Sequence, residues 1–136
     1  MLAAMLVYLC RHAKAADGDP DELRELTTRG VEQAHALGAQ LAAQPAPPEI
    51  VLASPLVRAR QTAEILAEET GAELRVSPLL APGATVGSLR LAVAATVGPV
   101  ATVGHQPDCS EIALAVTGHD PGFRPGAFAR LELGAE

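Results

Sequence analysis

Apolar and polar residues follow one another along this chain in blocks whose periodicity changes repeatedly. Short apolar or alternating runs predict β-strands, and longer stretches with apolar residues every three or four positions predict helices between them. The expected strands are Met5–Cys10, Ile50–Ala53, Glu73–Val76, Val100–Val103 and, at an edge, Ala127–Leu133. The expected helices run from Thr27 or Thr28 to about Gln44, from Ser54-Pro55 to about Glu69, from Thr85 to Val97 and from Pro107 to Val116. This alternation predicts an α/β fold with a mostly parallel central sheet.

Capping residues, glycines and prolines mark the expected helix ends. Thr27 or Thr28 can cap the first helix. Ser54-Pro55 is a favourable start for the second, because serine accepts from free backbone N–H groups and proline suits the first helical position. Gly71 and Gly118 are expected to end the second and fourth helices. One apolar stripe on the first helix should face the sheet, formed by Val31, Ala34, Leu37, Gly38 and Leu41.

The strand pattern also indicates where loops and the sheet centre lie. Val100–Val103 has no charged residue, as expected for a strand buried on both faces, so we place it centrally. The polar segment Ala13–Glu25 contains the turn Asp17–Pro20 and is expected to form a loop over the end of the first strand. Ser77–Ala84, punctuated by proline and glycine, is expected to be a second loop.

The composition narrows the possible functions. A chain of 136 residues is most simply one domain, so we expect residues 1–136 to form a single unit. Aromatic residues are only 2% of the chain, which disfavours stacking on exposed bases. The net charge of -6 also disfavours a nucleic-acid partner, because phosphate neutralisation requires a basic surface. Any positively charged site must therefore be local.

The first ten residues and the cysteines bear on the compartment. Met1–Cys10 is too short to span a bilayer and lacks the basic start and cleavage site of a signal peptide, so we expect no membrane association. Cys10 and Cys109 cannot form a disulfide framework, and a reduced, cytoplasmic location is the simpler interpretation. Cys109 near His105 could be a nucleophile, but burial as a small apolar residue is the more common role of cysteine.

Three predicted strands end in groups that bind anions. The first strand ends in Arg11-His12, the second leads to Arg58 in the first turn of a helix, and the fourth leads to His105. Open α/β sheets bind their ligands outside the carboxyl ends of the strands. The sequence therefore predicts that two arginines and two histidines meet at one edge of the sheet.

A histidine beside arginines can act as a nucleophile toward phosphorus. Neighbouring cations lower the imidazole pKa, which keeps a ring lone pair free while they bind the incoming dianion. The planar arginine fork fits two phosphoryl oxygens, and a helix N-terminus adds free N–H groups at Arg58. Arg11, Arg58 and His105 could stabilise the charge that develops on the phosphoryl oxygens during transfer.

Each of these segments has an ordinary explanation when taken singly. An Arg-His pair is commonly a surface feature, Ser-Pro a helix cap and Gly-His-Gln-Pro a turn. Zinc binding by His12 and His105 is a further alternative, which the adjacent arginines and the lack of a nearby carboxylate or thiolate quartet disfavour. The placement of all of them after strands favours a common site.

These segments together resemble a known family. Arg11-His12-Ala13 is similar to the Arg-His-Gly/Ala motif of the histidine phosphatase (phosphoglycerate mutase-like) superfamily. Three later blocks resemble the following motifs of that superfamily in the same order, and the short length and the Ala13-Lys14-Ala15 continuation resemble SixA-type phosphohistidine phosphatases. The blocks are Leu26-Thr27-Thr28-Arg29-Gly30, Ala53-Ser54-Pro55-Leu56-Val57-Arg58-Ala59-Arg60-Gln61-Thr62-Ala63 and Val103-Gly104-His105-Gln106-Pro107.

The resemblance implies a fold and a set of roles. The fold would be a three-layer α/β/α sandwich. His12 would be the nucleophile that is transiently phosphorylated, Arg11 and Arg58 would clamp the phosphoryl group, and His105 would hydrogen-bond it from the opposite side. No metal or organic cofactor is implied.

One departure from the family concerns the leaving group. Many members that cleave phosphate monoesters have an acid after a middle strand, which protonates the departing alkoxide. The corresponding stretch, Ser77 to Gly83, contains no acid. The imidazole of a phosphohistidine depends less on a positioned acid, so the gap favours an N–P substrate. An acid from the first loop could substitute, the candidates being Asp17, Asp19, Asp21 and Glu22.

The resemblance and the missing acid together predict a cytoplasmic phosphatase that removes phosphate from a protein phosphohistidine, its partner being a phosphohistidine-bearing protein such as a phosphotransfer domain. One alternative is a small-molecule phosphomonoesterase of the same superfamily. Another is a non-catalytic phosphohistidine-binding regulatory module, which the combination of a nucleophile with its phosphate clamps disfavours. The sequence leaves the oligomeric state and the pathway open.

Overall fold

A computed structural model describes residues 4–134, so Met1–Ala3, the start of the first apolar run, lie outside the described residues. The elements are five strands, four α-helices and two short 3₁₀ helices within this range. The strands are β1 (Met5–Arg11), β2 (Ile50–Ala53), β3 (Glu73–Val76), β4 (Val100–Gly104) and β5 (Phe128–Leu133). The helices are α1 (Thr28–Ala42), α2 (Val57–Thr70), α3 (Val86–Ala94) and α4 (Asp108–Thr117), with the 3₁₀ helices η1 (Asp21–Leu23) and η2 (Pro78–Leu80). All the expected strands and α-helices are present.

The strands form one mixed sheet in the order β3-β2-β4-β1-β5. β4 is central and pairs in parallel with β2 and β1, whereas β5 runs antiparallel to β1 at one edge. The central position of Val100–Val103 and the edge position of the last strand are therefore as predicted. Because the pairing sets Ala53 and Cys10 opposite Val103, three parallel strands end at the same level.

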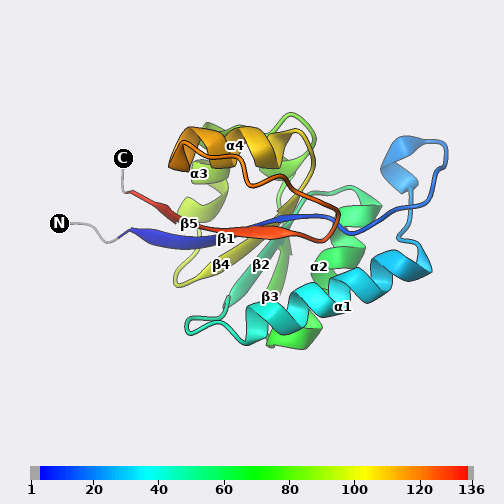
Figure 1. Ribbon diagram of the computed structural model, residues 1–136, viewed down its shortest axis with the longest axis horizontal. Coiled ribbons are helices and arrows are strands. Elements are labelled where there is room, and N and C mark those ends of the chain that lie inside the picture. Colours follow the sequence, from blue (N-terminus) through cyan, green and yellow to red (C-terminus); the bar gives the residue numbers. More distant parts are fainter. Residues whose placement is uncertain (1–3, 135–136) are drawn as a thin grey trace.

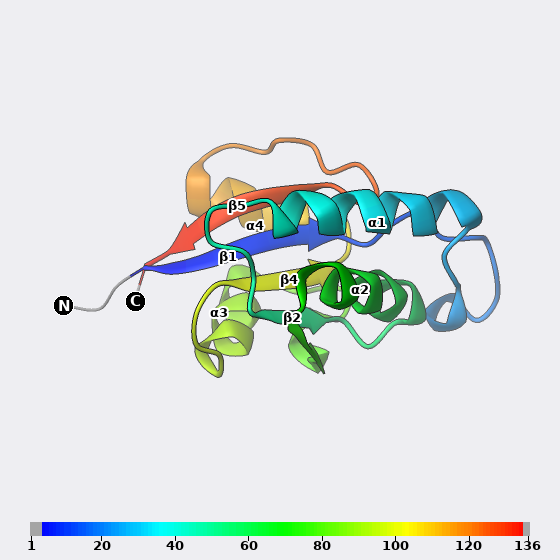
Figure 2. The same ribbon diagram turned by 90° about the horizontal axis from the view of Figure 1, so that it is seen from below.

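Helices cover both faces of the sheet (Figures 1 and 2). On one face α3 and α4 pack on alternate strand residues, including Val7, Leu9 and Val100. On the other, α1 and α2 pack on the intervening residues, including Tyr8, Cys10 and Ala101. This alternation follows from the period of two in a strand. The fold is thus the predicted three-layer α/β/α sandwich with a mostly parallel sheet.

The start of α1 differs from the prediction in which side chains face the core. Thr27 caps the helix as expected, its Oγ1 accepting from Gly30 N at 2.9 Å. Val31, predicted to lie on the apolar stripe, is instead 38% exposed, and Gly30 is buried. A Cβ added to Gly30 would lie 2.0 Å from the Lys14 carbonyl oxygen, so only glycine fits there. The close contact turns Val31 away from the sheet.

Two helices are shorter than the sequence predicts: α2 begins later, and α3 ends earlier. α2 begins at Val57 rather than at Ser54-Pro55, and its N-cap Leu56 provides no side-chain hydrogen bond. Ser54 continues the sheet pattern, since its N–H donates to the Val103 carbonyl, so it cannot enter the helix. α3 ends at Ala94, before the predicted Val97. Gly71 and Gly118 take left-handed conformations at the ends of α2 and α4, as predicted.

The two predicted loops contain the short 3₁₀ helices. η1 lies in the first loop, beyond the end of β1 and at the opposite end of the molecule from the start of β1 and the end of β5 (Figure 1). η2 lies in the second. Within residues 4–134, no helix is both long and apolar enough to cross a membrane.

Candidate active site

The ends of β1, β2 and β4 form the floor of the candidate site. One residue beyond β1, the His12 N–H donates to the Gly104 carbonyl at 3.0 Å, and one residue beyond β2, the Ser54 N–H donates to Val103 at 3.0 Å. His105 directly follows β4. The sheet register thus places His12, Ser54 and His105 side by side, and Arg58 projects from the first turn of the helix that follows Ser54.

The imidazole of His12 is held in one tautomer. Its Nδ1 lies 2.7 Å from the Ala13 carbonyl oxygen, which can only accept, so Nδ1 carries the proton. Its Nε2 lies 3.3 Å from Arg58 Nε, which can only donate, so Nε2 keeps its lone pair. The ring therefore presents an unprotonated nitrogen beside a guanidinium, as a nucleophile toward phosphorus requires.

A closed set of hydrogen bonds fixes His12 and Arg58 relative to one another. Thr62, fully buried on α2, donates from Oγ1 to the Arg58 carbonyl at 2.8 Å and accepts from the Ala13 N–H at 3.1 Å. Ala13 in turn accepts from His12, whose Nε2 faces Arg58. The nucleophile and the cation are therefore positioned by one network that joins the end of β1 to α2.

The guanidinium of Arg58 also reaches the first loop. Nη1 donates to the Asp21 carbonyl oxygen at 2.9 Å, and Nη2 lies 3.1 Å from Asp21 Oδ2. The side chain of Arg58 is buried, whereas that of Asp21 is 59% exposed. Hydrogen bonds from Arg24 and Arg58 hold the pKa of Asp21 below its ordinary value. Asp21 is therefore a carboxylate near neutral pH, which accepts hydrogen bonds but has no proton to give.

Both histidines are uncharged near neutral pH. Burial, with a further contribution from Arg58, lowers the pKa of His12 to about 4. Burial and the neighbouring His12 and Arg58 lower the pKa of His105 to about 4. The two rings are 5.2 Å apart between centroids and tilted by 56°. Neutral rings beside cations suit the binding of an anion and nucleophilic attack on it.

His105 and Arg11 complete the group. His105 is 4% exposed, and its Nε2 lies 2.7 Å from Ser54 Oγ, while its Nδ1 has no hydrogen-bond partner among the described residues. Arg11 ends β1 and donates from Nη1 to the Phe123 carbonyl at 2.9 Å. All four residues predicted from the sequence thus lie at one edge of the sheet.

Comparison with known proteins assigns the chain to a family. Residues 7–82 match the model of the histidine phosphatase superfamily (branch 1), which is more than half of the 136 residues. The chain belongs to this superfamily. The match includes the Arg11-His12 motif and the helix that carries Arg58.

Individual relatives agree with this assignment. An uncharacterized protein of Picosynechococcus sp. is 38% identical over 143 residues, covering 96% of this chain and 87% of that protein. The phosphohistidine phosphatase SixA of Escherichia coli is 36% identical over 86 residues, covering 61% of this chain and 53% of SixA. The structure of the protein histidine phosphatase SixA complexed with tungstate gives a TM-score of 0.81 at 30% identity, covering 93% and 86% of the two chains. Family and site together support phosphatase activity.

Several residues that shape this histidine phosphatase site were not predicted from the sequence to be part of it. Thr62 lies one helical turn after Arg58, and this i,i+4 spacing is the signal that could have indicated its contact with the Arg58 carbonyl. Arg24 pairs with Asp21 and contributes to the low pKa of His12, but nothing local in the sequence indicates that the loop returns it to the site. Ser54, interpreted as a helix cap, contacts His105 instead.

The acids considered as proton donors differ in their positions. Asp21 is the member of that group in contact with Arg58, and Asp17, Asp19 and Glu22 are exposed on the loop. The segment from Ser77 to Gly83 is attached to α4, because Asp108 Oδ2 accepts from the N–H groups of Gly83 and Ala84 at 2.9 and 3.1 Å. The Asp108 carboxylate is thus engaged in holding that segment.

The cysteines are buried, as expected for structural residues. Cys10 and Cys109 are both free, and each is at most 1% exposed. Burial raises the pKa of Cys109 to about 12 and that of Cys10 further still. A thiol held so far from ionisation is a poor nucleophile, so Cys109 does not compete with His12 for that role.

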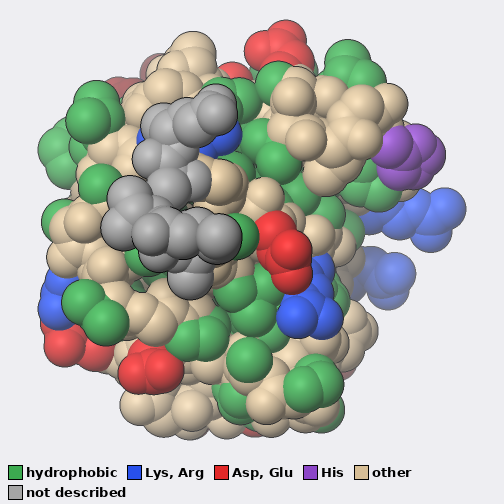
Figure 3. Space-filling view, turned by 90° about the vertical axis from the view of Figure 1, so that its left-hand side faces the viewer, with side chains coloured by type: hydrophobic (Ala, Val, Ile, Leu, Met, Phe, Trp, Pro, Cys, Tyr) green, Lys and Arg blue, Asp and Glu red, His purple; other side chains and the backbone are tan. Residues whose placement is uncertain are grey.

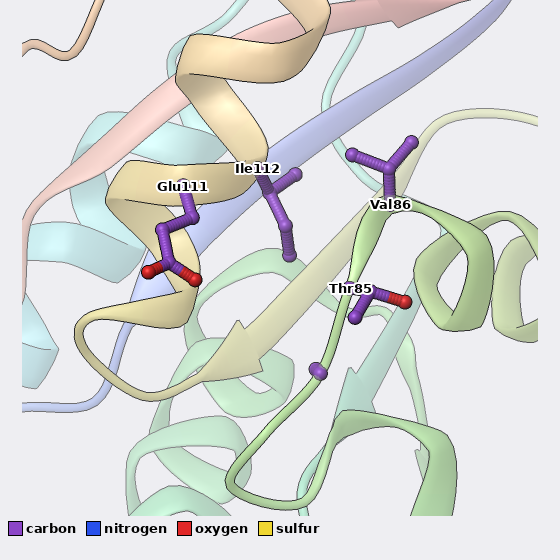
Figure 4. Close-up of a pocket in the computed structure, with 5 residues that line it drawn as sticks. Thr85, Val86, Glu111 and Ile112 are labelled. Carbon is purple, nitrogen blue, oxygen red and sulfur yellow. The ribbon is translucent and has the colours of Figure 1, made fainter.

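Two other surfaces of the described residues show no such gathering of arginines and histidines. A hollow between the start of α3 and α4 is lined by Thr85, Val86, Glu111 and Ile112 with Ala84, and it contains none of the four predicted residues (Figure 4). At the end opposite the strand exits, the visible charged side chains are scattered among apolar and neutral ones (Figure 3). In residues 4–134 no three His, Cys, Asp or Glu side chains lie together as a metal site would require.

Proposed function

We propose that this protein is a phosphatase that removes the phosphoryl group from phosphohistidine on a protein, through a transient phosphohistidine at His12. The observation that carries the proposal is the fixed tautomer of His12, with Nδ1 bound to the Ala13 carbonyl and Nε2 unprotonated beside Arg58. A ring used only to bind phosphate would serve better as an N–H donor at that nitrogen. The catalytic unit is a single histidine phosphatase domain spanning residues 1–136.

In the first step the phosphoryl group moves from the substrate to the enzyme. The lone pair of His12 Nε2 attacks phosphorus, the N–P bond of the substrate breaks, and its electron pair stays on the departing imidazole nitrogen. Arg58 and Arg11 bind the phosphoryl oxygens, on which charge must be stabilised, and His105 hydrogen-bonds them from the other side. His12 needs no deprotonation, because its Nε2 already lacks a proton.

In the second step water restores the enzyme. A water oxygen attacks the phosphorus of phospho-His12, the P–Nε2 bond breaks, and the electron pair returns to Nε2. One proton of the water is released, and phosphate leaves. Because Nδ1 keeps its proton on the Ala13 carbonyl throughout, His12 departs as a neutral imidazole and is ready for another turnover.

The lack of a proton donor for the leaving group supports phosphohistidine over a phosphate ester as the substrate. A substrate imidazole whose second nitrogen carries a proton leaves as a neutral molecule, whereas an alkoxide requires a proton at the moment of departure. The segment from Ser77 to Gly83 has no acid, and Asp21, the loop acid that reaches the site, is ionised. The relatives named as phosphohistidine phosphatases support the same substrate class.

The proposed partner is a phosphohistidine-bearing protein, such as a phosphotransfer domain, encountered in the cytoplasm. An exposed substrate histidine could approach the strand ends beside η1, whose Leu23 is 60% exposed. No nucleic acid is expected to bind, given the net charge of -6.

A side-by-side assay tests the proposal. The purified protein is incubated with a phosphohistidine-bearing protein and with a panel of sugar and nucleotide phosphate monoesters, and brief quenching is used to trap phosphoenzyme. We expect faster release of phosphate from phosphohistidine, acid-labile phosphate on the wild type, and neither signal for His12→Ala. His35→Ala is the matched control, because His35 lies on α1 and pairs with Glu69 away from the site.

The other outcomes identify the alternatives. Higher turnover on monoesters would indicate a small-molecule phosphomonoesterase of the same superfamily. Binding of a phosphohistidine protein without hydrolysis would indicate a regulatory module. Full activity of His12→Ala would refute the nucleophilic role of His12.

A further inference from the structure

Ser54 is the buried polar residue of the site for which the proposed reaction has no role. It is fully buried at the end of β2, and its hydroxyl lies 2.7 Å from His105 Nε2. The sequence assigns it to the start of a helix, but α2 begins three residues later. A buried hydroxyl that neither caps the helix nor faces solvent requires another explanation.

The direction of the Ser54–His105 hydrogen bond follows from where the Ser54 hydroxyl can place its proton. The backbone N–H of Leu56 lies 3.3 Å from Ser54 Oγ and can only donate to it. The hydroxyl has one proton of its own, and among residues 4–134 His105 Nε2 is the one acceptor within hydrogen-bond distance of it. Accepting this proton requires a lone pair on Nε2. In a neutral imidazole the single ring proton must then be on Nδ1.

We propose that Ser54 is a positioning residue that fixes His105 in the tautomer with its proton on Nδ1, so that Nδ1–H is the group that donates to the phosphoryl oxygens. This inference rests on the proposed phosphoryl transfer at His12, and it specifies which atom of His105 takes part. Leu56, Ser54 and His105 form a chain of donors that runs from the α2 N-terminus to the phosphoryl group.

The surroundings of His105 agree with this assignment. Nδ1 is buried and has no partner among residues 4–134, which for a ring N–H is unfavourable unless a ligand supplies an acceptor. The charges that act on the ring come from Arg58, Arg11 and Asp21, and the two arginines also act on His12. The low pKa of His105 keeps the ring neutral, so that its tautomer matters. The opposite tautomer would direct a lone pair toward the anion.

Nuclear magnetic resonance of the wild-type protein tests the tautomer directly. With ¹⁵N-labelled histidine, long-range ¹H–¹⁵N correlation spectra distinguish protonated from unprotonated ring nitrogens. Comparison with His12→Gln separates the signals of His105 from those of His12. At pH 7 we expect His105 to have a protonated Nδ1 and an unprotonated Nε2, and the Nδ1–H resonance to shift when inorganic phosphate is added. A protonated Nε2 in the wild type would overturn the proposal.

Two substitutions extend the test to catalysis. Ser54→Ala should leave the His105 tautomer mixed and lower kcat/KM about tenfold, the effect of one lost hydrogen bond. Thr102→Val is the matched control, because it removes another buried hydroxyl, one without a partner in the described structure, while keeping the shape of the side chain. An unchanged tautomer in Ser54→Ala, or an equal loss of activity in Thr102→Val, would contradict the proposal.

A hydroxyl-retaining variant separates positioning from packing. Ser54→Thr keeps the donor, so any folded Ser54→Thr protein should retain the wild-type tautomer. If neither variant of Ser54 folds, the spectra of the wild-type protein still test the tautomer, because they require no variant of Ser54 and no substrate. If the protein proves to hydrolyse phosphate esters instead of phosphohistidine, the tautomer and the response to inorganic phosphate remain as stated, so the two proposals fail separately.

Discussion

The two sides of the candidate site differ in how firmly they are held. On one side, the strand ends and α2 form a wall in which His12, Arg58 and His105 are each no more than 9% exposed. A hydrogen bond joins Arg58 to His12, and another joins His105 to Ser54. On the other, the loop between β1 and α1 contributes Asp21, whose side chain is 59% exposed. The wall has the rigidity that a nucleophile and its clamp require, whereas the loop contacts the same arginine from solvent.

The two sides also bring different charges to the site. Arg58 and Arg11 in the wall oppose protonation of His12 and attract an anion. The loop adds the cation Arg24, which also opposes protonation of His12, and the carboxylate of Asp21 beside Arg58. The rate of phosphoryl transfer should therefore depend on the wall. The affinity for the anion should also depend on the loop. The following predictions test this division of roles.

The largest effect is expected for the clamp in the wall. Arg58→Ala removes the donors nearest His12 Nε2 and should lower kcat/KM for phosphate release about a thousandfold, as loss of a transition-state donor does in other enzymes. Steady-state kinetics on a phosphohistidine protein measure the effect. Arg60→Ala, two residues along the same helix, is the control and should remain active. Equal activity of the two variants would remove Arg58 from the mechanism.

A large effect on folding is expected where the loop joins the wall. Gly30→Ala places a methyl group against the Lys14 carbonyl and should lower the free energy of unfolding by about 3 kcal/mol, as overpacking does. Gly87→Ala on α3 is the control, because within residues 4–134 the one neighbour of its Cβ position is Thr85, at 3.6 Å, and alanine favours a helix. Denaturant titration compares them. Equal stability of the two variants would show that the backbone at Lys14 shifts to accommodate the added methyl group.

A smaller effect on stability is expected from pH. The pKa of His12 and of His105 is about 4 in the folded protein against an ordinary value of 6.5. Between these values the unfolded chain binds protons that the folded chain does not, so stability should fall as pH decreases from about 6.5 through about 4. Urea midpoints across this range measure the loss. The loss should be smaller in His12→Ala, and an identical profile would contradict the buried neutral state of His12.

The smallest effect is expected for the loop. Asp21→Asn removes the carboxylate charge that partly neutralises Arg58. It should therefore lower the dissociation constant for inorganic phosphate up to about fivefold, the scale of an exposed ion pair. Isothermal titration measures the constant. Asp17→Asn, a neutralisation on the same loop, is the control for general charge. If both variants bind phosphate alike, Asp21 has no specific influence on the clamp.

The sequence was informative wherever local pattern determines structure. The absence of charge in Val100–Val103 predicted its central position, and the exits of three strands placed His12, Arg58 and His105 near one another. The errors concern contacts between residues distant in the chain. Val31 is exposed because Gly30 packs on Lys14, and Ser54 is outside α2 because it bonds Val103 and His105. Helical periodicity reports on neighbours within a few residues, so it could not predict these contacts with distant residues. The return of Asp21 to Arg58 was also beyond local pattern, because it depends on the path of a loop.

The first loop begins and ends at nearly the same point. Ala15 pairs with Leu26, Ala16 donates to the Glu25 carbonyl, and the Thr27 N–H donates to Lys14, so the intervening residues leave and rejoin the domain through a narrow neck. Closing a longer loop through such a neck adds little entropy cost. This segment could therefore be exchanged for one of another length or composition while the strand ends stay in place. In that sense the protein contains a replaceable module, through which recognition of a partner could diverge during evolution while the reaction is preserved.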